Sequence, residues 1–286
     1  MRRLRIKHLT DYRFAAHVSL QPHRLLLRPR EGHDVRIASS KLDIFPAAVV
    51  RWHRDAFDNS VAVASFLGTT DRLTIASEVV IEHYEEAPLD FLVADYAVNY
   101  PFVYNADERF DLSPFQSPVY ANDRSALQTW FDRLGIGRGT METYVLLDRM
   151  NRTIARELKY VIREEPGVQS PAQTLASGNA SCRDYATLFM EACRFLGLAS
   201  RFVSGYVHAP ETEDGNANTH AWAEVYLPGP GWKGFDPSTG EVTGARHIPV
   251  AVARHPETVS PVTGSFVGPN APPPSLLVDV RVESLQ

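Results

Sequence analysis

The sequence GNASCRDYATLFMEACRFLGLASRFVSGYV, residues 178–207, joins a predicted helix to a predicted strand. Ser181 is a good N-cap, and Asp184 three residues later gives a variant of the capping box, with a negative charge in the first turn. Gly197 ends the helix. The residues from Arg201 to Val207 then follow as a strand. We therefore expect a helix over 181–198 that is packed against a sheet.

Cys182 is the first residue inside this helix, where free backbone N–H groups and the positive end of the helix dipole favour a thiolate. A strand is predicted from His220 to Leu227, and it begins at a histidine that can act as a base. The strand after it delivers Asp236, a carboxylate that can orient the imidazole. A nucleophile, a base and an orienting acid in this order predict a Cys182-His220-Asp236 triad.

Each of these residues also has a plain structural interpretation. Cys182 is as easily a small core residue as a nucleophile, and His220 can be a surface or satisfied histidine. Asp236 precedes Pro237, which is a common turn signal. Their combination favours the catalytic interpretation over three separate structural ones.

The connection between the two strands decides whether this triad can form. If Leu227 faced Trp232 across a four-residue turn, Asp236 would lie opposite Ala223, on the face away from His220. One extra or missing residue moves Asp236 to the face of the histidine. We therefore predict an odd-length turn or a β-bulge near Gly229 to Gly234.

The first part of the chain has a different pattern. From Leu4 to about Tyr84 the apolar residues recur with a period near two, and no helix-length amphipathic stretch interrupts them. Strands are predicted over residues 25–27, 35–44, 48–52, 61–66 and 73–82. We expect an antiparallel β-sandwich domain over residues 1–87.

Residues 88–286 form the second predicted domain. Helical periodicity appears over residues 125–134 and again over 141–161, ahead of the helix that holds Cys182. The core of this domain covers about residues 141–240, and a C-terminal extension contains a last strand-like piece over 276–282. The whole chain is therefore predicted to be α+β.

Composition excludes several classes of protein. The 29 Lys and Arg residues against 34 Asp and Glu give a net charge of −5, and the basic residues are scattered, which argues against nucleic acid as the main partner. No run of 18 apolar residues is present, so we expect a soluble cytoplasmic protein with no membrane partner. Cys182 and Cys193 would lie about 16 Å apart on one helix, too far for a disulfide.

Metal and cofactor chemistry finds no support in the motifs. The ten histidines include no His-Glu-x-x-His pair, and neither Cys-x-x-Cys nor a phosphate-binding glycine loop occurs. We expect an enzyme without cofactor or metal. Oligomeric state is not encoded in any pattern that we can identify.

Four motifs occur in the order of a known family. They are Gly178-Asn179-Ala180-Ser181-Cys182-Arg183-Asp184-Tyr185-Ala186, Arg201 to Tyr206, His220 to Tyr226, and Gly231-Trp232-Lys233-Gly234-Phe235-Asp236-Pro237-Ser238. Together they resemble the core of the transglutaminase-like superfamily. The strand-rich first part, with His8-Leu9-Thr10-Asp11-Tyr12, is similar to the N-terminal domain of its bacterial branch.

The resemblance implies a papain-like core and a Cys-His-Asp enzyme. Such an enzyme attacks a carboxamide or peptide carbonyl, forms a thioester and passes the acyl group to water or to an amine. Cys182 corresponds to the nucleophile, His220 to the base and Asp236 to the orienting acid. Many relatives have glycine in place of Ala180 and threonine in place of Ser238, and neither difference removes a catalytic atom.

The resemblance leaves the activity open. The expected substrate is a protein or peptide, and the activity is either that of a cysteine protease or amidase or that of a protein-glutamine amine acyltransferase. We favour hydrolysis, although Glu211, Glu213 and Asp214 in the loop before His220 would attract a cationic amine if they bordered the cleft. The alternative from another class is a non-catalytic binding or scaffolding module.

The oxyanion of the reaction needs at least two donors. The backbone N–H of Cys182 is the first. Trp222 is a candidate for the second through its indole N–H, but the packing interpretation of this residue is favoured.

Overall fold

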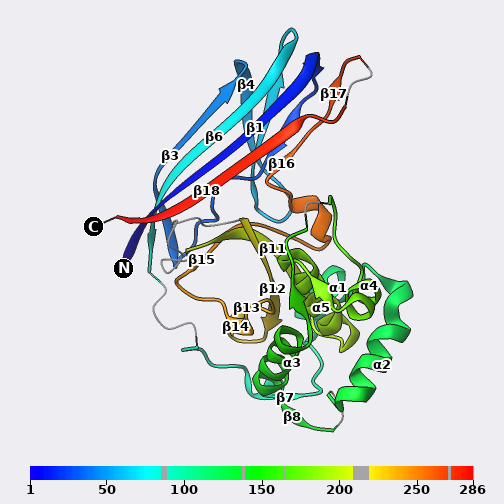
Figure 1. The fold of residues 1–286 in the computed structure, drawn as a ribbon. Coiled ribbons are helices and arrows are strands. Elements are labelled where there is room, and N and C mark those ends of the chain that lie inside the picture. Colours follow the sequence, from blue (N-terminus) through cyan, green and yellow to red (C-terminus); the bar gives the residue numbers. More distant parts are fainter. Residues whose placement is uncertain (85–88, 137–138, 164, 209–218, 270–271, 286) are drawn as a thin grey trace.

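The computed structural model describes residues 1–84, 89–136, 139–163, 165–208, 219–269 and 272–285. The chain forms a β region and a region in which helices pack on a sheet, as Figure 1 shows. This is the α+β architecture expected from the sequence.

The β region contains two antiparallel sheets. The first has the order β17-β1-β6-β3, with β18 also paired to β1, and the second has the order β16-β2-β5-β4. Their strands are β1 (Arg2–Leu20), β2 (His23–Leu25), β3 (Val35–Phe45), β4 (Ala48–Arg54), β5 (Ser60–Phe66), β6 (Thr70–His83), β16 (Val262–Thr263), β17 (Phe266–Val267) and β18 (Ser275–Leu285). Alternate residues of β1, β2, β5 and β6 form one apolar cluster, which includes Leu20, Leu25, Ala62 and Ile75. The expected sandwich is therefore present.

The first sheet is completed by the C-terminal part of the chain. Strand β18 runs antiparallel to β1 from the pair Arg3↔Leu285 to the pair Arg13↔Ser275. The two ends of the chain consequently lie close together in Figure 1. From its sequence, this segment was expected to extend the second domain. The proposed boundary at residue 87 falls outside the described residues, and the domain division stays a prediction.

The second region is built on the sheet β14-β13-β12-β11-β15. Its strands are β11 (Ser200–Val207), β12 (Thr219–Leu227), β13 (Gly231–Asp236), β14 (Glu241–Val242) and β15 (His247–Ala253). The helices are α1 (Ala106–Gln116), α2 (Arg124–Leu134), α3 (Thr143–Glu157), α4 (Pro171–Ser177) and α5 (Cys182–Phe195). Short elements are η1 (Asp95–Ala97), η2 (Ala121–Asp123), η3 (Pro256–Val259), and the strand pairs β7 (Asn99–Tyr100) with β8 (Met141–Glu142) and β9 (Lys159–Tyr160) with β10 (Asn179–Ala180). Helix α5 packs against β11 and β12, and its residues from Asp184 to Arg194 are all buried.

The helix predicted over residues 141–161 is wrong at its C-terminal end. Helix α3 ends at Glu157, because Leu158 adopts extended backbone angles (φ −107°, ψ 146°). The next two residues form β9, which runs parallel to β10 with Tyr160 opposite Ala180. The apolar residues keep their helical spacing past Glu157, which is why the sequence predicted a longer helix. The backbone N–H groups of Lys159 and Val161 instead donate to the carbonyls of Gly178 and Ala180.

Helices α1 and α4 were not predicted. Helix α1 buries only Leu112 and therefore has almost no apolar stripe. Helix α4 has seven residues, too few for a periodic signal, although Ser170 and Gln173 form a capping box at its start.

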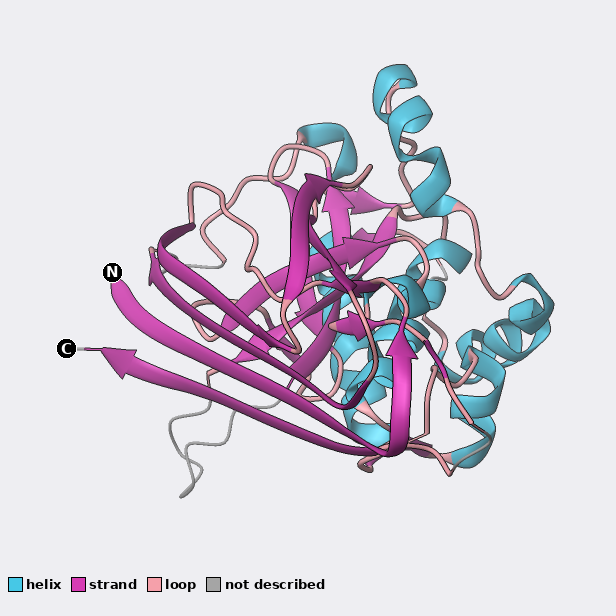
Figure 2. Cartoon of the chain, turned by 90° about the horizontal axis from the view of Figure 1, so that it is seen from above, coloured by secondary structure: helices cyan, strands magenta, loops and turns pink. Residues whose placement is uncertain are grey.

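The two regions share a hydrophobic core. Ile6, Val79 and Val282 of the first sheet belong to the same buried cluster as the residues of α5 and β11. The Nδ1 atom of His8 lies 2.9 Å from the hydroxyl of Tyr206, which links β1 to β11. Figure 2 shows most of the helices on the side of the molecule opposite the two chain ends. None of the described helices has the length and apolar character needed to cross a membrane.

Candidate active site

Cys182 is held at the N-terminus of α5. The Oδ2 atom of Asp184 accepts hydrogen bonds from the backbone N–H (2.9 Å) and the hydroxyl (2.8 Å) of Ser181. Arg163 binds both carboxylate oxygens of Asp184, at 2.8 and 2.9 Å. Buried Asp184 thus holds the start of the helix in place, while Cys182 remains partly exposed. No described residue accepts a hydrogen bond from the backbone N–H of Cys182, which leaves this donor free at the helix N-terminus.

His220 lies near the start of β12, opposite Gly205 of β11. A side chain at Gly205 would meet the carbonyl oxygen of Ile248 and come within 2.6 Å of the Trp222 ring. Trp222 is buried, and its ring centroid lies 6.3 Å from that of His220. A glycine at position 205 therefore allows Trp222 to pack beneath the catalytic histidine candidate.

The β12–β13 hairpin has the odd-length turn that the triad requires. Leu227 pairs with Gly231, so three residues, 228–230, form the turn. The ladder continues to Ala223↔Phe235, and the next residue, Asp236, therefore points to the same face as His220. The Nε2 atom of His220 lies 2.7 Å from Oδ2 of Asp236. The prediction of an odd-length turn is confirmed.

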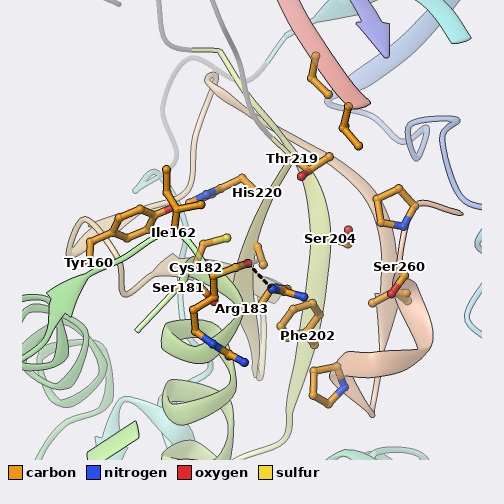
Figure 3. Close-up of a pocket in the computed structure, with 17 residues that line it drawn as sticks. Tyr160, Ile162, Ser181, Cys182, Arg183, Phe202, Ser204, Thr219, His220 and Ser260 are labelled. Atoms are coloured by element: carbon orange, nitrogen blue, oxygen red, sulfur yellow. Dashed lines mark hydrogen bonds between the residues drawn. The ribbon is translucent and has the colours of Figure 1, made fainter. Parts of the chain in front are cut away.

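His220 lies between Asp236 and Cys182. Because Nε2 binds the carboxylate, Nδ1 is the ring nitrogen available to the thiol. Burial by itself lowers the pKa of His220, but hydrogen bonds with Asp236 and Cys182, together with the negative charges of these groups, raise it to about 10. The imidazole therefore holds its proton at neutral pH. Figure 3 shows the Cys182 sulfur close to the His220 ring at the edge of a cavity.

Asp236 is a buried carboxylate with several donors. Oδ1 accepts hydrogen bonds from the backbone N–H (3.0 Å) and the hydroxyl (2.6 Å) of Ser238, so the serine supplies the hydroxyl that threonine has in many relatives. Oδ2 accepts from His220 and, at 3.2 Å, from Nε2 of His247. Burial by itself raises the pKa of Asp236, but these hydrogen bonds and the charge on His220 hold it well below its usual range.

His247 is a member of this network that the sequence analysis missed. Its Nδ1 atom accepts a hydrogen bond from the backbone N–H of Gly244 (3.4 Å), which places the ring proton on Nε2, facing Asp236. The ligand-type atoms of His220, Asp236 and His247 lie within 4.8 Å of one another. Both rings direct Nε2 at the same carboxylate oxygen, an arrangement that hydrogen bonds explain in full. A histidine at the start of an apolar strand was the only signal in the sequence.

A cavity of about 370 Å³ opens beside Cys182 and His220. One wall comes from the segment with Tyr160, Ile162 and Arg163. The opposite wall includes Phe202, Ser204, the β18 residues Val278 and Val280, and four residues of one short segment, Pro256, Val259, Ser260 and Pro261. Strand β18 belongs to the β region, so both regions contribute to this cleft. No local pattern connects β18 with the site, because β18 pairs with β1 at the other end of the chain.

Two candidates from the sequence do not contribute to the cleft as described. Trp222 does not line it; its ring packs edge-on against His247 at 5.2 Å and faces a second cavity behind the triad candidates. This agrees with a packing role. Glu211, Glu213 and Asp214 lie outside the described residues.

Comparisons with known proteins identify the family. Residues 4–82 match the bacterial transglutaminase-like N-terminal region, and residues 133–237 match the transglutaminase-like superfamily. This chain belongs to the transglutaminase-like superfamily. The expected family and its bacterial N-terminal domain are therefore confirmed, and the second match contains Cys182, His220 and Asp236.

Proteins similar to this chain match it over most of its length. An uncharacterized protein of Mycobacterium tuberculosis is 27% identical over 290 residues, covering 92% of this chain and 87% of the relative. An uncharacterized protein of Mycobacterium leprae is 22% identical over 286 residues, covering 98% and 99%. A crystal structure from Cytophaga hutchinsonii, named "Putative Cysteine Protease", superposes with a TM-score of 0.75 at 16% identity, covering 100% of this chain and 91% of that one. The two-region architecture is thus the fold of a known structure.

Proposed function

We propose that this transglutaminase-like protein is a cysteine amidase or protease that cleaves amide or peptide bonds through a thioester. The observation that carries the proposal is the position of His220, which contacts Cys182 on one side and Asp236, at 2.7 Å, on the other. His220 acts first as base and then as acid, Cys182 is the nucleophile, and Asp236 is the carboxylate that orients the imidazole. The cleft beside Cys182 gives a peptide access to the nucleophile.

The proposed reaction has two stages. In the first, the Cys182 thiolate attacks the carbonyl carbon, and the electron pair of the C=O bond moves to oxygen. When the C=O bond forms again, the C–N bond breaks and the leaving amine takes the proton of His220. In the second stage, neutral His220 removes a proton from water, which attacks the thioester and restores the thiolate and the imidazolium. No cofactor takes part in either stage.

The charges of the cleft support water as the acyl acceptor. Of the described residues that line it, none is acidic, whereas Arg163 and Arg183 are cationic. Asp184 pairs with Arg163 and offsets its positive charge. Arg183 donates to the neutral backbone carbonyls of residues 163 and 165, which do not offset its charge. A protonated primary amine would meet this positive charge. Transfer to a cationic amine is therefore the second candidate, and hydrolysis the first.

A substrate screen tests the proposal. Wild-type protein and Cys182→Ala are incubated with glutamine-containing and other peptides, with and without a labelled primary amine, and the products are identified by mass spectrometry. Cleavage or deamidation by the wild type alone supports the hydrolase. Amine incorporation that outpaces hydrolysis would favour the acyltransferase, and identical behaviour of the two proteins on every substrate would favour the non-catalytic module.

A further inference from the structure

The thiol of Cys182 has a second neighbour besides His220, the hydroxyl of Tyr160. Strand β9 places Tyr160 opposite Ala180, two residues before Cys182. The tyrosine lines the cleft, and in Figure 3 its ring extends towards Cys182 and His220. Tyr160 and Cys182 line the same cavity, and the proximity of Cys182 is one cause of the raised pKa of Tyr160. Tyr160 has no part in the Cys182-His220-Asp236 relay, so this contact requires an explanation of its own.

We propose that the Tyr160 hydroxyl is the second donor of the oxyanion hole, together with the backbone N–H of Cys182. This assignment rests on the proposed function, because an oxyanion forms only when the thiolate attacks a carbonyl. The backbone N–H is free at the helix N-terminus, and Tyr160 faces the same cavity as Cys182 from the strand beside it. The two donors therefore approach the reacting atoms from two different elements.

Movement of charge during the attack explains why one hydroxyl can serve first the Cys182 sulfur and then the carbonyl oxygen of the substrate. In the thiolate that attacks the substrate, the negative charge lies on Sγ, in the cavity that Tyr160 also lines. When the C–S bond forms, the charge passes to the carbonyl oxygen, which lies two bonds from the sulfur. A donor close to Sγ needs only a small rotation to follow the charge. The hydroxyl keeps its own proton throughout and donates a hydrogen bond only, so His220 remains the sole proton donor to the leaving amine.

The surroundings of Tyr160 suit a fixed donor. Its ring stacks on Tyr185, with centroids 6.3 Å apart and an interplanar angle of 22°. The hydroxyl of Tyr185 donates to the carbonyl of Leu158 at 2.7 Å, which ties the stacking partner to the residue before β9. Burial and the nearby charges of Cys182 and Asp236 raise the pKa of Tyr160 to about 12, so the hydroxyl retains its hydrogen at neutral pH.

Two reactions of Cys182 separate the oxyanion role from a role in activating the thiol. Alkylation by iodoacetamide consumes the thiolate and forms no oxyanion. An aldehyde adds to the thiolate and forms a hemithioacetal, whose oxygen occupies the position of the oxyanion. The probes are acetaldehyde, which is too small to need a fitted side chain, and a short peptide aldehyde. Aldehyde affinity is measured as protection of Cys182 from iodoacetamide.

The variants are Tyr160→Phe and the matched control Tyr84→Phe, which removes an exposed tyrosine hydroxyl in the β region. We expect Tyr160→Phe to weaken aldehyde binding by about 10- to 100-fold, and to leave the alkylation rate within about threefold of the wild type. Tyr84→Phe should match the wild type in both reactions. Equal aldehyde affinity in Tyr160→Phe and wild type overturns the assignment, as does a parallel loss in both reactions, which would show that Tyr160 acts on the thiol.

Failure of the proposed function has a separate signature. If iodoacetamide labels Cys182 but neither aldehyde protects it in the wild type, the thiol does not add to carbonyls. The amidase proposal is then overturned, and the role of Tyr160 with it. Protection of the wild type, with unchanged protection in Tyr160→Phe, removes only the assignment of the tyrosine.

Discussion

The Nε2 atom of His247 lies 3.2 Å from Oδ2 of Asp236, the same oxygen that binds His220 at 2.7 Å. Since Nδ1 of His247 is an acceptor, a neutral ring can donate this hydrogen bond. His247 thus holds the carboxylate from the side away from Cys182. In the proposed reaction it is a positioning residue, because it would act on the reacting atoms only through Asp236.

Replacement of His247 should weaken catalysis through the carboxylate. We expect His247→Leu to lower kcat about tenfold, the value of one hydrogen bond to a charged group, with little change in KM. His247→Gln keeps an N–H donor and should recover part of the loss. His53→Leu, at an exposed histidine of β4, is the control. A loss confined to thermal stability, with unchanged kcat in the folded fraction, would contradict the positioning role.

The pKa of His220 predicts the alkaline limit of activity. The leaving amine needs a protonated imidazole, and a pKa raised to about 10 keeps the ring protonated over neutral and mildly alkaline pH. Activity should therefore fall as the pH rises through about 10. Asp236→Asn removes one cause of the raised pKa, so the alkaline limit should move to lower pH, and kcat should fall by about 10² to 10⁴. A pH–rate profile checks both effects. An unchanged alkaline limit in Asp236→Asn would argue against the pairing of these two residues.

The two thiols should differ in reactivity. Cys182 is partly exposed at a helix N-terminus, whereas Cys193 is fully buried in the same helix and burial raises its pKa. We expect iodoacetamide to label Cys182 much faster than Cys193 near neutral pH, and to continue labelling it below pH 7. Peptide mapping after timed quenching gives both rates. Equal rates in the folded protein would contradict an activated thiolate.

The β18 wall of the cleft should select substrates. Val278 lines the cleft, and Leu277, on the other face of the strand, does not. Val278→Asp should lower kcat/KM for peptides with apolar side chains by about tenfold, and Leu277→Asp, of similar exposure, should not. The alkylation rate of Cys182 should be the same in both variants. Equal kcat/KM values for the two variants would remove β18 from the substrate site.

Gly205 should not tolerate a larger residue. A methyl group there would come within 2.6 Å of the Trp222 ring, beneath His220. We expect Gly205→Ala to destabilise the fold by about 1–3 kcal/mol. We also expect a lower kcat at temperatures at which the variant is still folded, because a displaced Trp222 ring shifts His220. Urea unfolding and activity at low temperature separate the two effects. A wild-type unfolding midpoint would show that the strands can move apart at this point.

The parts of the site that could be predicted from sequence are those with local signals. The start of α5 follows from Ser181 and Asp184, and the need for an odd-length turn follows from strand alternation in 220–236. His247, Tyr160 and Val278 were missed because strand pairing across long sequence separations brings them to the site. Tyr160 was assigned to a helix, since the apolar period of α3 continued into β9, and a two-residue strand leaves no periodic pattern.

The residues that form this cleft are synthesised at different times, because β18 follows the rest of the site in the sequence. A chain made from its N-terminus has produced Cys182, His220 and Asp236 before it produces Val278 and Val280. During synthesis, Cys182 and His220 therefore exist while one wall of their cleft is still missing. If Val278 selects substrates as expected, a newly made molecule gains its reactive residues before its selectivity, because β18 is the last of the described strands to be made.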